Sequence, residues 1–119
     1  MSKKVFVLDA SGIIGGFLSG KYSNYTTSQV VTEIKDIKSE LSLQAALENK
    51  QITIKEPSTR DIGEVEEVIT RSGDLLRLSD VDKGVIALAV KLKRDDLSPT
   101  VVTDDYSIQN VLKIMEIPF

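Results

Sequence analysis

The sequence predicts a three-layer α/β/α sandwich with a mostly parallel central sheet. Short apolar segments, typical of buried strands, alternate with longer segments in which apolar residues recur at helical spacing. Acidic residues directly follow the first and last of these strands, where α/β sheets bind ligands. With 119 residues, 41% hydrophobic and 28% charged, and a net charge of −3, the composition is that of one globular domain. We expect that domain to cover residues 1–119.

A buried parallel strand is expected at Lys4–Leu8, because KVFVL is a continuous apolar run that is too short for a helix. Asp9 ends this strand and begins a short helix. The next segment, Ser19–Thr26, is polar and contains Gly20 and two tyrosines, which predicts a loop.

Two helices and a second strand are expected after this loop. Thr26 or Thr27 is placed to cap a helix that ends near Lys35, and another helix covers Lys38–Asn49. The segment QITIK, at Gln51–Lys55, alternates polar and apolar residues and therefore predicts a strand.

The middle of the chain predicts one longer helix. Ser58 or Thr59 is placed to begin it, and the helical spacing continues to about Arg71. Gly73 then follows as a helix-ending residue.

The last third predicts a helix, a strand and a helix. Ser79 caps a strongly apolar helix that ends near Arg94, and TVVT at Thr100–Thr103 is a strand. A helix over Asp104–Met115 follows it, and Glu116–Phe119 has the pattern of a further strand that is cut short. We therefore expect either a C-terminally truncated form of a longer protein or a related stand-alone protein.

Cysteine and histidine are both absent from the sequence. Their absence excludes disulfides, thiolate nucleophiles, zinc–sulfur sites and the Ser–His–Asp triad. The lack of cysteine fits a reducing compartment, so a cytoplasmic location is expected. We expect no signal peptide and no association with a membrane, because no apolar run approaches the roughly 20 residues that span a bilayer.

Two carboxylates lie on or beside the apolar faces of predicted helices. Asp82 precedes Val85 by three residues and Ile86 by four, so it lies on the apolar face of its helix. A capping box from Ser79 to Asp82 would explain an acid in this turn, but not its inward direction. Glu33 borders an apolar helix face in a similar way, and a solvated position at the edge of that face is the structural alternative.

Acids also follow the strands directly. Asp9 comes after the first strand, and Asp104 and Asp105 come after TVVT. Each could simply cap a helix or interact favourably with its dipole, and helical periodicity does not choose between Asp104 and Asp105. Acids gathered at such positions would repel one another without a compensating charge. A hard divalent cation such as Mg²⁺ or Mn²⁺ would supply that charge through oxygen ligands.

Four segments of the chain resemble the PIN-domain nucleases: VFVLDASGII, TTSQVVTEIKD, LSDVDKGVIALA and VVTDDYSIQNVL. The second and third, with VTDDYSIQN, are similar to the Nob-type branch, whose members make the final 3′-end cut of small-subunit ribosomal RNA. The resemblance implies a metal-dependent endoribonuclease that acts on single-stranded RNA.

The resemblance also assigns roles to individual residues. Four acids match the catalytic and metal-binding acids of the family: Asp9, Glu33, Asp82 and Asp105. The last follows from the family's T-x-D pattern after Thr103, which leaves Asp104 at the variable position as an additional metal ligand. Ser11 matches the hydroxyl residue two positions after the first acid, and Ser11 and Thr103 are assigned supporting roles.

The implied chemistry needs no histidine. One or two Mg²⁺ or Mn²⁺ ions would lower the pKa of water and stabilise negative charge in the transition state, giving 5′-phosphate and 3′-hydroxyl products. The implied partner is small-subunit precursor RNA within a pre-ribosomal particle. Because the sequence has no cysteine, we expect no zinc in this chain and no zinc ribbon of the kind usual in the Nob-type branch within these residues.

RNA that approaches an acidic pocket needs basic and stacking side chains at its rim. Lys21, Tyr22 and Tyr25, in the loop after the first strand, are candidates near the carboxyl edge, as is Tyr106; ordinary packing is the alternative for the tyrosines.

Three other functions share parts of this pattern. A VapC-type toxin ribonuclease has the same site, and a PIN scaffold could bind RNA or protein without cutting. A receiver domain is disfavoured because only one acid follows the first strand and no Lys-Pro follows a late one.

Overall fold

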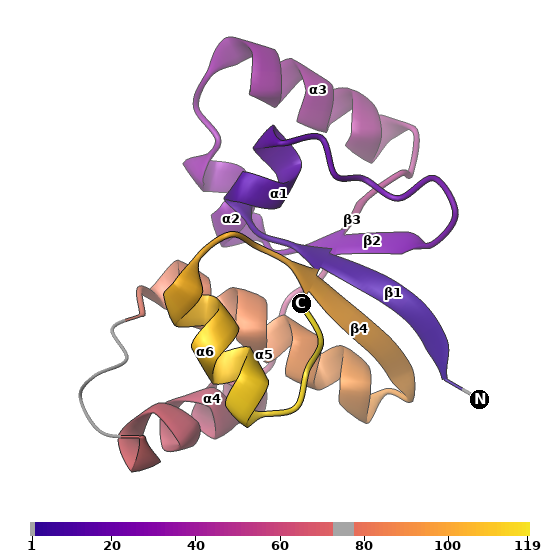
Figure 1. Ribbon diagram of the computed structural model, residues 1–119. Helices are drawn as coiled ribbons and strands as arrows, with labels where there is room; N and C mark the ends of the chain where they lie inside the picture. The colour runs from indigo at the N-terminus through magenta and orange to yellow at the C-terminus, as the bar shows by residue number, and fades with distance from the viewer. Residues whose placement is uncertain (1, 73–77) are drawn as a thin grey trace.

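The computed structural model describes residues 2–72 and 78–119 (Figure 1). Its centre is one sheet of parallel strands in the order β3-β2-β1-β4. The strands are β1 (Lys3–Leu8), β2 (Ser23–Thr26), β3 (Thr53–Ile54) and β4 (Leu97–Val102). Since the strands are parallel, their carboxyl ends meet at one edge of the sheet.

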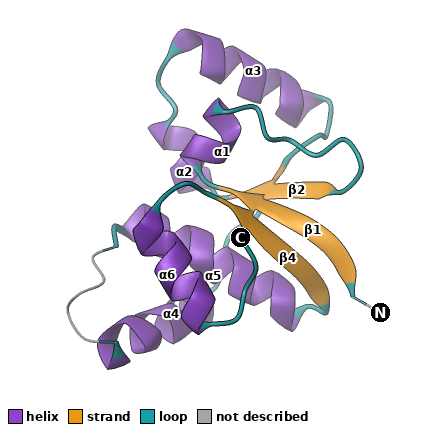
Figure 2. Cartoon of the chain, in the orientation of Figure 1, coloured by secondary structure: helices purple, strands orange, loops and turns teal. Residues whose placement is uncertain are grey.

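Helices cover both faces of this sheet, which confirms the predicted three-layer class (Figure 2). On one side lie α1 (Ala10–Ile14) and α3 (Ile37–Glu48), and on the other lie α4 (Thr59–Arg71), α5 (Asp80–Arg94) and α6 (Tyr106–Ile114). The short α2 (Ser28–Glu33) follows the carboxyl end of β2 and contacts both α1 and α5.

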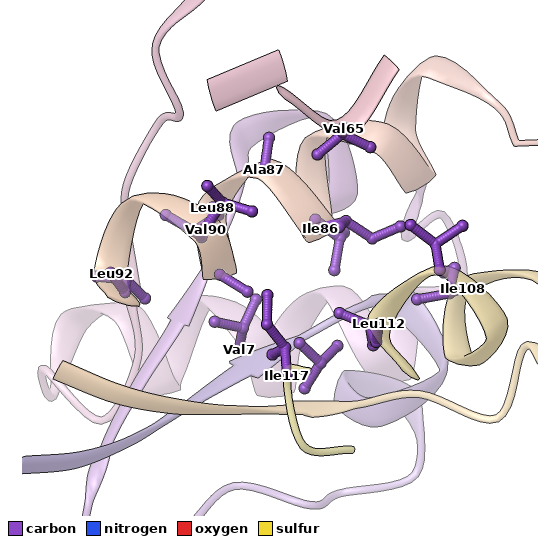
Figure 3. Packing of buried hydrophobic residues seen from close by; sticks show 14 of the residues in the cluster. Val7, Val65, Ile86, Ala87, Leu88, Val90, Leu92, Ile108, Leu112 and Ile117 are labelled. Atoms are coloured by element: carbon purple, nitrogen blue, oxygen red, sulfur yellow. The ribbon is translucent and has the colours of Figure 1, made fainter. Parts of the chain in front are cut away.

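The main hydrophobic core is built around α5 (Figure 3). Residues from Gly84 to Val90 are all buried in this helix, and they pack with Val7 of β1 and Leu112 of α6. A helical segment that is buried on all sides has to be enclosed by other elements, and the middle of α5 lies between the sheet, α4 and α6. Its N-terminus is thereby held at the carboxyl edge, because only two residues join its other end to β4.

The predicted loop over Ser19–Thr26 is wrong in its second half, which forms β2. Two polar side chains of this strand are buried, Asn24 at 2% and Thr26 at 0% exposure. Both are satisfied by hydrogen bonds to distant backbone: Asn24 Nδ2 donates to the carbonyl of Gln51 (2.9 Å), and Thr26 Oγ1 donates to that of Leu8 (2.8 Å). A strand that buries satisfied polar groups has no apolar pattern to reveal it.

The other predicted helices and strands are present with shifted ends, except for the strand expected at Glu116–Phe119. β4 begins at Leu97 and continues through Pro99, which is tolerated because β4 is the last strand in the sheet order. The segment Glu116–Phe119 forms no strand, although Val101 N donates to the carbonyl of Pro118 (2.9 Å) and so fixes the segment beside β4. α4 ends at Arg71, and the predicted stop at Gly73 lies outside the described residues.

None of the helices within residues 2–72 and 78–119 combines the length and apolarity that crossing a bilayer requires.

Candidate active site

β1 and β4 end side by side, and the acids that follow them are therefore neighbours. Leu8 pairs with Val102 in the sheet register, and Asp9 N donates to the carbonyl of Val102 (3.4 Å). The residues after the two strands consequently leave the sheet at the same place. This placement brings Asp9 next to the segment that contains Asp104 and Asp105.

The Asp9 carboxylate is held in a fixed orientation at the start of α1. Its Oδ1 accepts hydrogen bonds from Gly12 N (3.0 Å) and Ser11 Oγ (2.7 Å), and only 8% of the residue is exposed. Ser11 Oγ in turn accepts a hydrogen bond from Asp104 N (3.4 Å). The Ser11 hydroxyl therefore links the residues that follow β1 and β4.

Asp104 and Asp105 have different environments, which the sequence pattern did not separate. Asp105 is the N-cap of α6, and its Oδ1 accepts hydrogen bonds from Ser107 N (2.8 Å) and Ile108 N (3.4 Å). Asp104 is exposed and precedes the cap, so the expected start of the helix at Asp104 is wrong. Thr103 Oγ1 accepts a hydrogen bond from Asp105 N (3.1 Å), which helps to orient this turn.

Asp82 lies in the first turn of α5 and forms the capping box that was its structural alternative. Asp82 N donates to Ser79 Oγ (3.1 Å), and Ser79 N donates to Asp82 Oδ2 (3.3 Å). The side chain is half-buried at the N-terminus of α5, which faces the carboxyl edge of the sheet. The cap therefore accounts for one carboxylate oxygen and leaves Oδ1 available.

Glu33 is the last residue of α2 and is exposed. α2 begins at the carboxyl edge, where Thr27 caps it by accepting a hydrogen bond from Val30 N (3.2 Å). Within the described ranges, no hydrogen bond joins Glu33 to the other acids. The structure thus brings Asp9 and Asp105 to one place, puts Asp82 on a neighbouring helix end, and leaves Glu33 at the far end of its helix.

Asp9, Asp82 and Asp105 share one feature that suits a cation. Each uses one carboxylate oxygen to cap a helix, and the ion pairs in the described part of the chain involve other acids, on α4 and at the end of α5. Oxygen donors of this kind fit a hard divalent ion. Across residues 2–72 and 78–119, no three acidic side chains are gathered into a complete set of metal ligands, so ion binding requires these side chains to move together.

Gly12 is a residue of this site that the sequence reasoning missed. A Cβ atom at this position would lie 2.9 Å from the carbonyl oxygen of Val102 and 3.1 Å from Val102 Cγ1. Only a glycine lets α1 approach the end of β4 so closely. The signal in the sequence is a glycine three residues after a strand-end acid, which is too common to be specific.

Replacing Gly12 with alanine is expected to destabilise the protein by about 1–2 kcal/mol, because the new methyl group overlaps rigid backbone. Urea unfolding followed by circular dichroism measures the change. Gly63→Ala is the matched control: it also lies within a helix but has open space around it, so alanine should stabilise the fold by about 0.5–1 kcal/mol. Equal effects of the two substitutions would refute the close-approach explanation.

The predicted RNA-contacting residues divide into two groups. Tyr106 is 81% exposed at the start of α6, near the acids, and Tyr25 is half-buried in β2 with Lys55 Nζ 5.8 Å from its ring centroid. The expected position of Lys21 and Tyr22 near the carboxyl edge is wrong. The loop after α1 runs back to the start of β2, at the opposite end of the sheet (Figure 1).

A parallel sheet with acids at its carboxyl edge is common to several classes of nucleotide- and nucleic-acid-processing protein, and comparison with known families decides among them. The chain belongs to the PIN-domain family of ribonucleases: the family model described as the PIN domain of ribonuclease matches residues 6–92.

The individual relatives agree with the resemblance to the Nob-type branch. The chain is 46% identical over 114 residues to Endoribonuclease Nob1 of Methanothermobacter thermautotrophicus, covering 95% of this chain and 66% of the relative. It is 34% identical to Endoribonuclease Nob1 of Pyrococcus abyssi, covering 98% of this chain and 68% of the relative. Ribonuclease VapC1 of Thermoplasma acidophilum is 35% identical, with coverages of 97% and 56%. The predicted family is thereby confirmed, and the chain spans between about half and two thirds of these relatives.

Proposed function

We propose that this domain is a metal-dependent endoribonuclease that cuts single-stranded RNA, and that its reaction is the 3′-end maturation of small-subunit ribosomal RNA in a pre-ribosomal particle. One observation carries the proposal: β1 and β4 end together, so that Asp9 and Asp105 lie at one edge of the sheet, each with a carboxylate oxygen not used in capping. The relatives named Endoribonuclease Nob1 support the choice of reaction.

PIN-domain nucleases generally use divalent metal ions, and the donor set here suits Mg²⁺ or Mn²⁺. In the proposed site, one or two such ions are held by Asp9, Asp82 and Asp105, with Glu33 and Asp104 as further ligands. A bound ion would supply hydroxide near neutral pH by lowering the pKa of water, and zinc is not proposed for a chain without cysteine.

The protein's own residues prepare the acids for this role. Ser11 Oγ and Gly12 N hold the Asp9 carboxylate, and the first turn of α6 holds that of Asp105. Each of these carboxylates keeps one oxygen free of the capping hydrogen bonds, and ion binding would draw those free oxygens together. Residues 1–119 are proposed to act as one catalytic domain in the cytoplasm.

A VapC-type toxin ribonuclease is the second candidate, because VapC1 of Thermoplasma acidophilum and VapC3 of Aeropyrum pernix are also similar to this chain. Their identities, 35% and 32%, are lower than the 46% identity to Nob1 of Methanothermobacter thermautotrophicus. A non-catalytic scaffold is disfavoured, because all four acids of the family pattern are present.

Incubation of the protein with an end-labelled small-subunit precursor RNA tests the proposal. Cleavage at one position near the mature 3′ end is expected with Mn²⁺ or Mg²⁺, and none is expected with EDTA, because the carboxylates cannot promote hydrolysis without the ion. Cleavage of an unrelated single-stranded RNA with the precursor left intact would favour the toxin class.

Thermal melts in the same buffers provide the control. A bound ion relieves the repulsion between the acids and should raise the melting temperature relative to EDTA, and Asp82→Asn should reduce that rise. A folded protein that neither shifts its melting temperature nor cuts RNA at millimolar Mn²⁺ would refute the proposal.

A further inference from the structure

Lysines and aromatic rings gather at the end of the sheet opposite the acids. Lys4 Nζ lies 5.1 Å from the ring centroid of Phe6 and 5.5 Å from that of Tyr22, and Lys21 Nζ lies 5.3 Å from the Tyr22 centroid. The rings of Phe6 and Tyr22 are 5.9 Å apart and tilted by 59°. We call these residues, together with Lys50, the amino-edge surface.

Lys50 joins this surface through a hollow of about 390 Å³ that it lines together with Lys21, Tyr22 and Gln51. Buried Asn24 fixes the wall of the hollow: its Nδ2 donates to the carbonyls of Ser19 and Gln51 (2.9 Å each), and its Oδ1 accepts from Ser19 N (3.1 Å). The hollow is therefore tied to the sheet and is formed before any ligand arrives.

The amino-edge surface carries positive charge on a protein whose net charge is −3. Lys4, Lys21 and Lys50 are exposed, and the ion pairs in the described part of the chain all involve other basic residues, on α4 and α5. Glu116 is the acid that shares a neighbouring hollow with Lys4. Three lysines that form no ion pair with any described carboxylate are complementary to a polyanion.

We propose that the amino-edge surface binds single-stranded RNA at a distance from the scissile bond. This inference rests on the proposed ribonuclease function and adds a second binding region to it. The lysines would contact phosphates, and the rings of Tyr22 and Phe6 would stack with bases. An acidic peptide has no bases to stack on these rings. An acidic peptide would use the lysines alone.

The geometry also sets the length of RNA that is needed. Lys4 lies five positions before Asp9 in the sequence, which is about 17 Å along an extended strand. Stacked nucleotides advance about 3.4 Å each, so an RNA must extend about five nucleotides beyond the acids to reach the lysines. Shorter RNA contacts the acidic site without the amino-edge surface.

Binding of a labelled 20-nucleotide single-stranded RNA, measured by fluorescence anisotropy in EDTA at several salt concentrations, tests this proposal without cleavage. The variant Lys4→Gln/Lys21→Gln/Lys50→Gln should bind more weakly, and the slope of log K against log salt should fall by about 2, since each phosphate contact on a single strand contributes about 0.7. The control Lys35→Gln/Lys38→Gln/Lys113→Gln changes three exposed lysines and the net charge equally, and should keep the wild-type slope.

A second pair of variants tests the stacking ring. Tyr22→Ala should weaken binding about tenfold, whereas Tyr22→Phe should retain it, because the ring and not the hydroxyl contacts the base. Equal salt slopes for the two triple variants would overturn the proposal. So would equal losses of affinity for RNA and for a poly-glutamate peptide, which would identify a general polyanion site.

The two proposals fail in different ways. RNA that is bound through the amino-edge surface but is not cut with Mn²⁺ would refute the ribonuclease function alone. RNA that is cut by the wild-type protein while the lysine triple variant binds normally would refute the amino-edge surface alone.

Discussion

Asp105→Asn is expected to slow RNA cleavage by on the order of a hundredfold or more in the presence of Mn²⁺. Asparagine is as good an N-cap as aspartate, so the hydrogen bonds to Ser107 N and Ile108 N can be kept and α6 should still form. The substitution therefore removes the negative charge that helps to bind the ion and leaves the fold intact. Single-turnover cleavage of labelled RNA measures the effect, after circular dichroism has confirmed folding.

Asp104→Asn is the matched control for this prediction. Asp104 precedes the N-cap, is exposed, and contributes its backbone N–H to Ser11. The substitution keeps that N–H and should reduce cleavage clearly less than Asp105→Asn. If Asp104→Asn is the more damaging of two folded variants, the carboxylate nearest the ion is that of Asp104, and the site has to be redrawn around it.

The elements that the sequence predicted well are those whose burial is apolar. The strand KVFVL and the helix from Asp80 to Arg94 are recognisable in the sequence because their buried positions carry apolar residues. β2 was missed because Asn24 and Thr26 are buried with hydrogen-bond partners 27 and 18 residues away. No local pattern encodes partners at that distance.

The meeting of Asp9 and Asp105 at one edge of the sheet was predictable, because the carboxyl ends of parallel strands lie at the same edge. Helical periodicity did not distinguish Asp104 from Asp105, because it does not show which of the two residues caps α6. The position of Lys21 and Tyr22 depends on how far the loop after α1 travels before β2 begins, which sequence spacing does not give. The path of such a loop, and therefore the position of its residues, has to be taken from the structure.

A buried ion pair that ties α4 to α5 was also absent from the sequence reasoning. Asp61, with no exposed surface, accepts hydrogen bonds from Ser58 N (2.7 Å), from Ser58 Oγ (2.8 Å) and from the guanidinium of Arg94. Arg94 also donates to Glu64 (2.8 Å). Asp61 and Arg94 are 33 residues apart, so they are brought together only by the packing of the two helices.

Burial by itself would raise the pKa of Asp61, but the hydrogen bonds from Ser58 and the charge of Arg94 outweigh it and lower the pKa below its ordinary value of 3.8. A carboxyl group whose pKa is lowered by folding stabilises the native state above the pKa of the unfolded chain. That stabilisation is lost as the pH falls through the pKa of the folded state. The ion pair therefore contributes fully at neutral pH and fades in acid.

Arg94→Gln is expected to reduce the free energy of unfolding by about 2 kcal/mol at pH 7, because it leaves the Asp61 carboxylate buried without its countercharge. The loss should stay below the 3–5 kcal/mol typical of fully buried pairs, since solvent reaches the Arg94 side chain and Ser58 still donates to Asp61. Urea unfolding at pH 7 and near pH 3 measures it, and the difference from wild type should shrink at the lower pH.

Arg60→Gln removes only the exposed pair with Glu64, whose atoms are 3.7 Å apart, and should change stability by less than about 0.5 kcal/mol. Equal losses for the two variants would show that burial of Asp61 adds nothing to the pair.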